Sequence, residues 1–239
     1  MIKTFYIMLI LLLCSGLFAE NNFKVEYKGA LKNMMHKGDI SAKCSLSEIA
    51  DKEHIYALGA LENLQGEIQI FDSEPFNSKG LNEEIEISDS YDEKASLLVF
   101  AQVSEWIELD VPKEILTYEQ LEKFIALKAE ETGIDTEQPF PFLLTGTPES
   151  IDWHIIKWKI GDNEHSHQKH IESGPHGTLE ETEMDILGFY SDKHHTVFTH
   201  HTTNMHLHFK TSDEKIAGHL DGMILGQNMV LKLPKSNKK

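Results

Sequence analysis

The sequence contains no arginine. All 22 of its basic residues are lysine, against 39 acidic residues, so the formal net charge is −17. No guanidinium fork is therefore available to hold an anionic substrate, and lysine, histidine, backbone amides or a metal ion must do so instead. So acidic a chain argues against partners that are polyanions, which excludes nucleic acid and anionic membrane surfaces as expected ligands.

Long apolar runs are also absent. No stretch of twenty consecutive apolar residues occurs, so no clear membrane span is predicted. Lys3, the apolar run 5–13 and the small residue Ala19 before a polar stretch form the pattern of a secretory signal peptide, which we predict to be residues 1–19. After cleavage we expect no membrane attachment and a periplasmic or extracellular location. An uncleaved anchor is the alternative, although the run 5–13 is too short to span a bilayer.

Cysteine is scarce in the same way. Removal of residues 1–19 would leave Cys44 alone, so the mature protein has no internal disulfide despite an expected oxidising compartment. A lipid anchor on Cys14 is a further alternative, but Leu13 stands before it where a small residue is expected. A chain of about 220 residues can bury a core large enough to fold without disulfides.

Residues 20–239 are predicted to form one α+β domain that is rich in strands and has few helices. The clearest helix covers 117–132, where Thr117 and Gln120 make a capping box and Gly133 ends the helix. Its apolar stripe comprises Leu121, Phe124, Ile125 and Ala129.

Strands are predicted from alternation and from short apolar runs. Segment 67–71 alternates polar and apolar residues and is expected to be a half-buried strand, and 96–103 a buried one. Residues 59–64 are expected to be turn-rich, and the histidine-rich segment 164–177 a surface loop. Several strands joined by tight turns should follow in 184–233, which gives mixed and antiparallel sheets.

Three histidines in that last region have the spacing of a metal site. His206 and His208 stand two apart on a predicted strand, so their side chains project from the same face while Leu207 points into a core. His219 follows after the turn 212–214 and can return on the next antiparallel strand beside them. Three histidines with an open fourth position are the usual ligands of a catalytic zinc ion.

Other histidines could compete for this role. A bare His-x-His pair is a weak signal in a chain with 14 histidines, and a pair of plain strand histidines is the alternative. Of the adjacent pairs at 194–195 and 200–201, at most one member can face the site, and His200 could support a ligand across the hairpin from His206. The histidines of 164–177 are expected to be solvated, with adventitious metal capture as the alternative.

The segments His206-Leu207-His208-Phe209 and Gly218-His219 resemble the metal motif of the acetolactate decarboxylases. Gly66-Glu67 and the stretch from Pro141-Phe142 to Gly146 resemble further segments of that family. The resemblance extends over most of the mature chain. It implies one zinc ion per chain and the loss of carbon dioxide from 2-acetolactate, or a related 2-hydroxy-3-oxo acid, to give acetoin. It leaves a homodimer open.

The same resemblance assigns two further residues. Glu67 matches a family glutamate and becomes the candidate for proton handling, with a solvent-facing strand residue as the alternative. His154 stands where the family has an arginine that grips the substrate, with a plain strand residue packed near Trp153 and Trp158 as the alternative, and Ala60 stands where the family has a threonine. A secreted metal-binding protein without catalysis, and another zinc lyase or hydrolase on the same scaffold, therefore remain alternative hypotheses.

Overall fold

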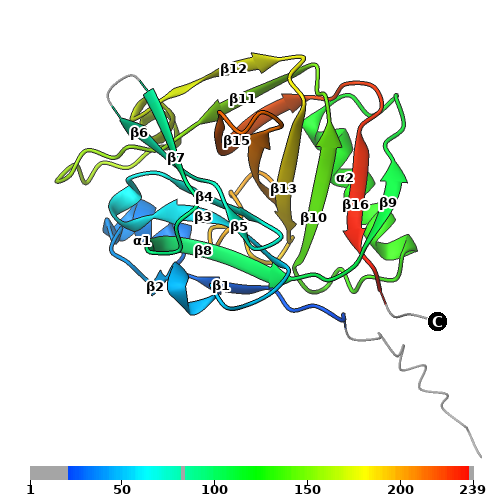
Figure 1. Cartoon of the computed structure of the whole chain (residues 1–239), viewed down its shortest axis with the longest axis horizontal. Helices are drawn as coiled ribbons and strands as arrows, with labels where there is room; N and C mark the ends of the chain where they lie inside the picture. Colours follow the sequence, from blue (N-terminus) through cyan, green and yellow to red (C-terminus); the bar gives the residue numbers. More distant parts are fainter. Residues whose placement is uncertain (1–20, 82–83, 237–239) are drawn as a thin grey trace, which may run out of the picture.

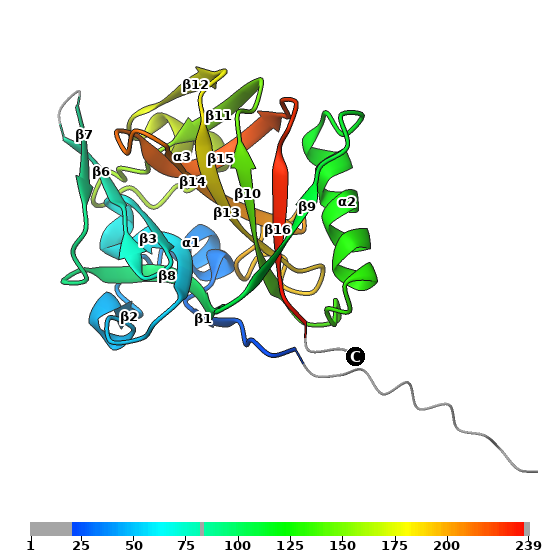
Figure 2. The same ribbon diagram turned by 45° about the vertical axis from the view of Figure 1, so that its right-hand side comes forward.

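The computed structural model describes residues 21–81 and 84–236. The predicted signal peptide, 1–19, lies outside the described residues. Two antiparallel sheets face each other, and a long helix, α2 (Tyr118–Glu131), covers the outer face of the second sheet (Figures 1 and 2). None of the helices in the described part of the chain is long and apolar enough to cross a membrane.

The first sheet is built from the N-terminal half of the chain and has the order β1-β8-β3-β4-β6-β7, with β2 paired to β8 and β5 to β4. Its strands are β1 (Glu26–Lys28), β2 (Cys44–Ser45), β3 (Ile55–Leu61), β4 (Glu67–Phe71), β5 (Glu74–Pro75), β6 (Asn77–Leu81), β7 (Glu84–Ser88) and β8 (Lys94–Gln102).

The second sheet has the order β12-β11-β15-β14-β13-β10-β16-β9, so β15 and β14, which carry the predicted metal ligands, lie inside it. Its strands are β9 (Trp106–Asp110), β10 (Phe140–Gly146), β11 (Ser150–His154), β12 (His176–Glu180), β13 (Met184–Tyr190), β14 (Met205–Thr211), β15 (Ala217–Ile224) and β16 (Val230–Pro234).

The remaining elements are short apart from α2. They are α1 (Leu31–Lys37), α3 (His167–Glu172) and the 3-10 turns η1 (Leu46–Glu48) and η2 (Glu62–Leu64). The predicted α2 is confirmed: the Thr117 hydroxyl accepts from the Gln120 backbone, and the Gln120 side chain accepts from the Thr117 backbone. These bonds satisfy amides that would otherwise lack partners at the start of the helix. The strand-rich α+β class is likewise confirmed.

Two of the three hydrophobic clusters in the described part of the chain pack against the second sheet. Between the second sheet and α2, residues such as Phe124, Leu207 and Phe209 pack together. Between the two sheets, Leu58 and Val99 of the first pack against Leu187 and Phe189 of the second. The second sheet is therefore covered on both faces, and polar side chains on its inner face are removed from water.

Three local predictions were wrong. Strand β4 is buried along its whole length rather than on one face, because the second sheet covers the face that carries Glu67 and Gln69. Residues 59–61 belong to strand β3, and only 62–64 form a turn. Segment 164–177 contains helix α3 and the start of β12, because Ser166 caps the helix by accepting from the Lys169 amide.

Candidate metal centre

Histidines line up across adjacent strands on the inner face of the second sheet. His208 of β14 is paired with His219 of β15, and His219 is paired in turn with His154 of β11. Directly paired residues on antiparallel strands project from the same face, and His206, two residues before His208, does so too. Leu207 and Phe209 point the other way, into the core beside α2, as predicted.

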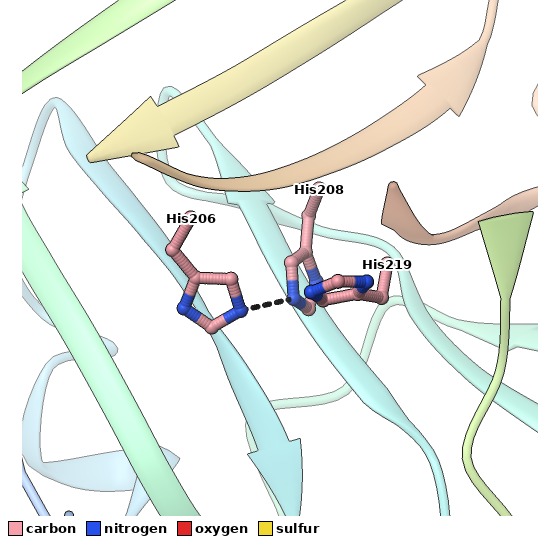
Figure 3. Close-up of side chains that lie close together, drawn as sticks. All are labelled: His206, His208 and His219. Atoms are coloured by element: carbon pink, nitrogen blue, oxygen red, sulfur yellow. Dashed lines mark hydrogen bonds between the residues drawn. The ribbon is translucent and has the colours of Figure 1, made fainter. Parts of the chain in front are cut away.

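The three predicted ligands converge on one point (Figure 3). His206, His208 and His219 each offer a nitrogen, and these atoms all lie within 4.8 Å of one another. Nε2 of His206 and Nε2 of His208 are 3.3 Å apart. Tetrahedral zinc with bonds of about 2.0–2.1 Å places neighbouring ligand atoms about 3.3–3.4 Å apart, so this pair fits such an ion.

The electrostatic environment of His206 and His208 also suits the binding of a cation. Only 9% of His206 and 1% of His208 are exposed. Burial lowers the pKa of both imidazoles well below the usual range, and the neighbouring histidines lower it further. Both rings are therefore neutral at physiological pH, which is the form that binds a metal.

Gln69 of β4 determines which nitrogen of His208 is free. The Gln69 side-chain nitrogen donates to the Phe76 carbonyl and to the Ser78 hydroxyl, so its carbonyl oxygen faces Nδ1 of His208 at 3.1 Å. That oxygen can only accept, so His208 Nδ1 carries the proton and Nε2 keeps its lone pair. Such outer partners orient metal-binding histidines.

Glu67 lies on the same face of strand β4 as Gln69, and only 4% of it is exposed. Its Oε1 accepts a hydrogen bond from the Ile156 amide at 3.1 Å and lies 3.8 Å from His154 Nε2, while its Oε2 lies 3.8 Å from His208 Nε2. Burial raises the pKa of Glu67 well above the usual range, partly offset by that amide. Glu67 is therefore not a solvent-facing strand residue but a buried carboxylic acid next to the metal ligands.

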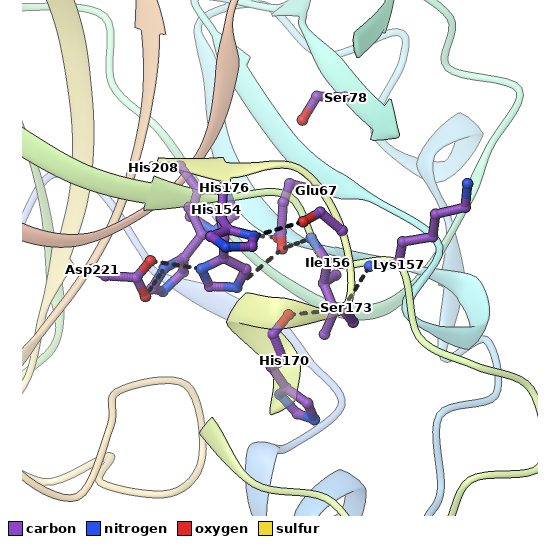
Figure 4. A network of polar contacts seen from close by, with 12 residues as sticks. Glu67, Ser78, His154, Ile156, Lys157, His170, Ser173, His176, His208 and Asp221 are labelled. Atoms are coloured by element: carbon purple, nitrogen blue, oxygen red, sulfur yellow. Dashed lines mark hydrogen bonds and ion pairs between the residues drawn. The ribbon is translucent and has the colours of Figure 1, made fainter. Parts of the chain in front are cut away.

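His154 connects Glu67 to Asp221 (Figure 4). Asp221 Oδ2 lies 2.7 Å from His154 Nδ1, which donates to it, so Nε2 of the ring faces Glu67 with a lone pair. Burial lowers the pKa of His154 to about 4, against the opposing effect of Asp221. Burial would raise the pKa of Asp221, but the contacts with His219, His154 and His167 outweigh it and lower that pKa.

Asp221 owes its position to a bulge. Strand β11 pairs Trp153 with Leu220 and Asp152 with Gly222, so Asp221 is an extra residue on β15 without a partner opposite it. Bulges of this kind re-aim a side chain and are common beside functional sites. Here the bulge accompanies a carboxylate on the same face as the histidines.

The structure thus brings together all five residues singled out from the sequence, namely Glu67, His154, His206, His208 and His219. Sequence reasoning missed Gln69, Asp221 and His167. Strand alternation could have indicated Gln69, which is two residues after Glu67. Asp221 lies at a bulge that only the strand pairing reveals.

The competing histidines are distributed differently. His200 donates to or accepts from the Thr202 hydroxyl at 2.8 Å, and its ring lies 5.3 Å from that of His167, so it flanks the site rather than supporting His206. His165 and His170 contact each other and Trp158. His167 is the member of segment 164–177 that reaches the site, with Nε2 at 3.4 Å from Asp221 Oδ1.

Comparison with known proteins identifies the family and the fold. The family model described as alpha-acetolactate decarboxylase matches residues 27–238. The fold is similar to that of alpha-acetolactate decarboxylase from Bacillus subtilis strain 168, with a TM-score of 0.69 and 15% identity over 90% of each chain. A Staphylococcus aureus protein of unknown function, described as similar to alpha-acetolactate decarboxylase, gives a TM-score of 0.67 at 15% identity, over 89% of this chain and 86% of its own. A search of curated protein sequences finds no match.

Proposed function

This chain belongs to the alpha-acetolactate decarboxylase family, and from that premise we propose that it is a zinc-dependent carboxy-lyase that converts 2-acetolactate, or a related 2-hydroxy-3-oxo acid, to acetoin and carbon dioxide. The observation that carries the proposal is a buried glutamate whose carboxyl oxygen lies 3.8 Å from Nε2 of His208, one of the three histidines that could bind a cation. Family membership supports a decarboxylase; the ion and the substrate are inferred from the residues of the site.

His206, His208 and His219 would hold the ion. A bound divalent cation supplies a Lewis acid for the negative charge that decarboxylation leaves on the substrate. The residues around it exclude water, since His206, His208 and Gln69 are buried between the two sheets. Because His208 keeps its proton on Nδ1 through Gln69, its orientation is fixed before any ion arrives.

Glu67 is the proton donor in this scheme. The bond between the substrate carbon and its carboxylate breaks, carbon dioxide leaves, and the electron pair stays on the remaining carbon skeleton. Glu67 then delivers its proton to that carbon and becomes a carboxylate. A raised pKa suits this task because it brings the carboxyl group closer to the pH at which a general acid works.

His154 would restore the proton of Glu67. Asp221 holds the ring through Nδ1, and Nε2 lies 3.8 Å from Glu67 Oε1. A proton taken up at Nε2 can pass to Glu67, while the negative charge of Asp221 stabilises the transient imidazolium. His154 thus has a positioned role that a plain strand residue would lack.

The same pair favours a second candidate substrate. The imidazole of His154 cannot make the bidentate contact with a carboxylate that an arginine makes, and Asp221 adds a negative charge behind it. A related 2-hydroxy-3-oxo acid whose carboxylate needs no bidentate partner is therefore the second candidate substrate beside acetolactate.

The decisive experiment supplies 2-acetolactate to purified, tag-free, zinc-loaded protein and measures acetoin. We expect formation above the spontaneous rate, and a Glu67→Gln variant should lower it by about 100-fold or more because the transferable proton is lost. Glu74→Gln, on the neighbouring strand β5 and exposed, is the matched control and should keep full activity.

Both variants should retain the metal content of the parent protein, so a loss of activity in Glu67→Gln reports on the proton. Acetoin at the spontaneous rate from the loaded parent protein would overturn acetolactate as the substrate. Assay of larger and of uncharged 2-hydroxy ketone analogues would then decide between another lyase substrate and a metal-binding protein without catalysis.

A further inference from the structure

The carboxylate of Asp221 is surrounded by three imidazoles from three elements. His154 Nδ1 of β11 lies 2.7 Å from Oδ2, and His219 Nδ1 of β15 lies 3.2 Å from Oδ1. His167 Nε2, from helix α3, lies 3.4 Å from Oδ1. The Asp221 side chain is 10% exposed and that of His154 6%. Asp221 and His154 therefore lie mostly out of water, beside the histidine triad, whereas His167 of α3 is half-exposed.

Hydrogen bonding accounts for only part of this cluster. The bond from His154 Nδ1 satisfies Asp221 Oδ2. The other two contacts are close but lack hydrogen-bond geometry, so Asp221 Oδ1 and His219 Nδ1 are buried polar atoms without a hydrogen-bond partner. Buried polar groups are almost always paired, and an ion-binding site is one of the standard reasons for an exception.

The spacing and the charge both suit a cation. The ligand atoms of His154, His219 and Asp221 lie within 4.8 Å of one another, and His167 Nε2 approaches Asp221 Oδ1 to 3.4 Å, so the four side chains gather around one region. One carboxylate and three imidazoles carry a net charge of −1 when the rings are neutral. Nitrogen donors with a single carboxylate are typical of zinc and of other late first-row metals rather than of magnesium or calcium.

We propose that His154, His167, His219 and Asp221 form a second site for a divalent transition-metal cation, next to the histidine triad. His219 gives Nδ1 to this site and Nε2 to the triad, so its ring bridges two cations. When a cation binds at the second site, the proton of His154 would move from Nδ1 to Nε2, and the bridging His219 ring would release its proton to solvent. The proposal does not depend on decarboxylase activity, because it concerns cation binding alone.

The position of His167 gives the second cation its route of entry. The side chain of His167 is 52% exposed and sits on the short helix α3, whereas His154 is buried below it. An ion can therefore be captured from solvent by His167 and passed inward to Asp221. This assigns a role to one member of the histidine-rich segment 164–177 that the triad itself does not use.

The test is the number of zinc ions retained per chain. Metal-free protein is loaded with zinc, passed through a desalting column and analysed for metal and protein content. We expect two ions per chain for the parent protein and one for His167→Ala, which alters an exposed side chain and should fold. His206→Ala should also retain one ion, because it removes a triad ligand and leaves the second site complete. His36→Ala is the matched control: it removes an exposed imidazole on α1, away from both sites, and two ions should remain.

Cobalt loading adds a readout for the bridge. Two cobalt ions joined by His219 should be magnetically coupled in the parent protein and uncoupled in His167→Ala, as measured by paramagnetic resonance. One ion per chain in the parent protein, or two ions in both His167→Ala and Asp221→Asn, would overturn the second site. Neither result would affect the proposed decarboxylase, which needs only the triad ion and is measured by acetoin.

Discussion

At the scale of single residues, the site depends on side chains that fix the tautomers of its histidines. Gln69 is fully buried, and its amide is fixed by the Phe76 carbonyl and the Ser78 hydroxyl. It therefore presents only an acceptor to His208, which sets the tautomer of that ring. Asp221 does the same for His154. Two residues that bind no ion in the triad thus decide which nitrogens of other rings remain available.

Replacing Gln69 by leucine should weaken zinc binding without abolishing it. The His208 ring would lose the acceptor for its Nδ1 proton, and loss of such an outer partner lowers metal affinity about 10- to 100-fold. Competition with a chromophoric chelator measures the change. Gln102→Leu, whose exposed side chain bonds the Glu53 carbonyl, is the matched control. Unchanged affinity in Gln69→Leu would mean that Gln69 does not orient His208.

At the scale of elements, helix α3 and the chain before it form a small aromatic unit. The ring of His165 stacks on Trp158 at 4.4 Å, and His170 packs against the same indole and approaches His165 Nδ1 at 3.0 Å. This packing holds α3 over the inner face of the second sheet and so places His167 above Asp221. Segment 164–177 is thus ordered by contacts that a reading of it as a solvated loop does not include.

This aromatic unit makes the free energy of unfolding depend on pH. Burial, with a smaller contribution from His165, lowers the pKa of His170 to about 3, whereas in an unfolded chain it is about 6.5. The folded state binds fewer protons, so the stabilisation is complete above pH 6.5 and is lost as the pH falls from 6.5 towards 3.

The free energy of unfolding, measured in urea at pH 7 and pH 5 on metal-free protein, should therefore fall less for His170→Gln than for the parent chain. His36→Gln, at an exposed position of α1, should behave like the parent chain. An equal decrease in all three proteins would contradict the assignment.

At the scale of the whole molecule, the site lies at the interface between the two sheets. The cation ligands lie on β14 and β15 of the second sheet, and Glu67 and Gln69 come from β4 of the first. The apolar layer around Leu58 and Phe189 holds these two faces together. A cation bound there should stabilise the packing of the sheets, because the unfolded chain has no such site.

Chelation should consequently lower the melting temperature. A ligand at 100 times its Kd adds about 2.7 kcal/mol to the free energy of unfolding, which for a chain of this length corresponds to roughly 5–10 °C. Calorimetry with and without a chelator measures the shift. His219→Ala removes the residue shared by both proposed sites, and its melting temperature should not respond. If neither zinc nor the chelator changed the melting temperature of the parent protein, the proposal that a bound cation stabilises the fold would be contradicted.

What the sequence determined by itself is local. Capping residues and apolar spacing predicted α2, and alternation along 205–209 put His206 and His208 on one face, because both effects act within a few residues. The resemblance to a family then singled out Glu67 and His154, and the structure places both at the site.

Only the tertiary structure decided which residues pack against the strand faces that carry the site. Alternation along 67–71 indicates that Glu67 and Gln69 share a face but not that a second sheet buries it, and this burial is what raises the pKa of Glu67. The bulge at Asp221 and the approach of His167 depend on strand pairing and on packing between segments far apart in the chain. Periodicity specifies the direction of a side chain, whereas its neighbours, and hence its protonation and its chemistry, follow only from the fold.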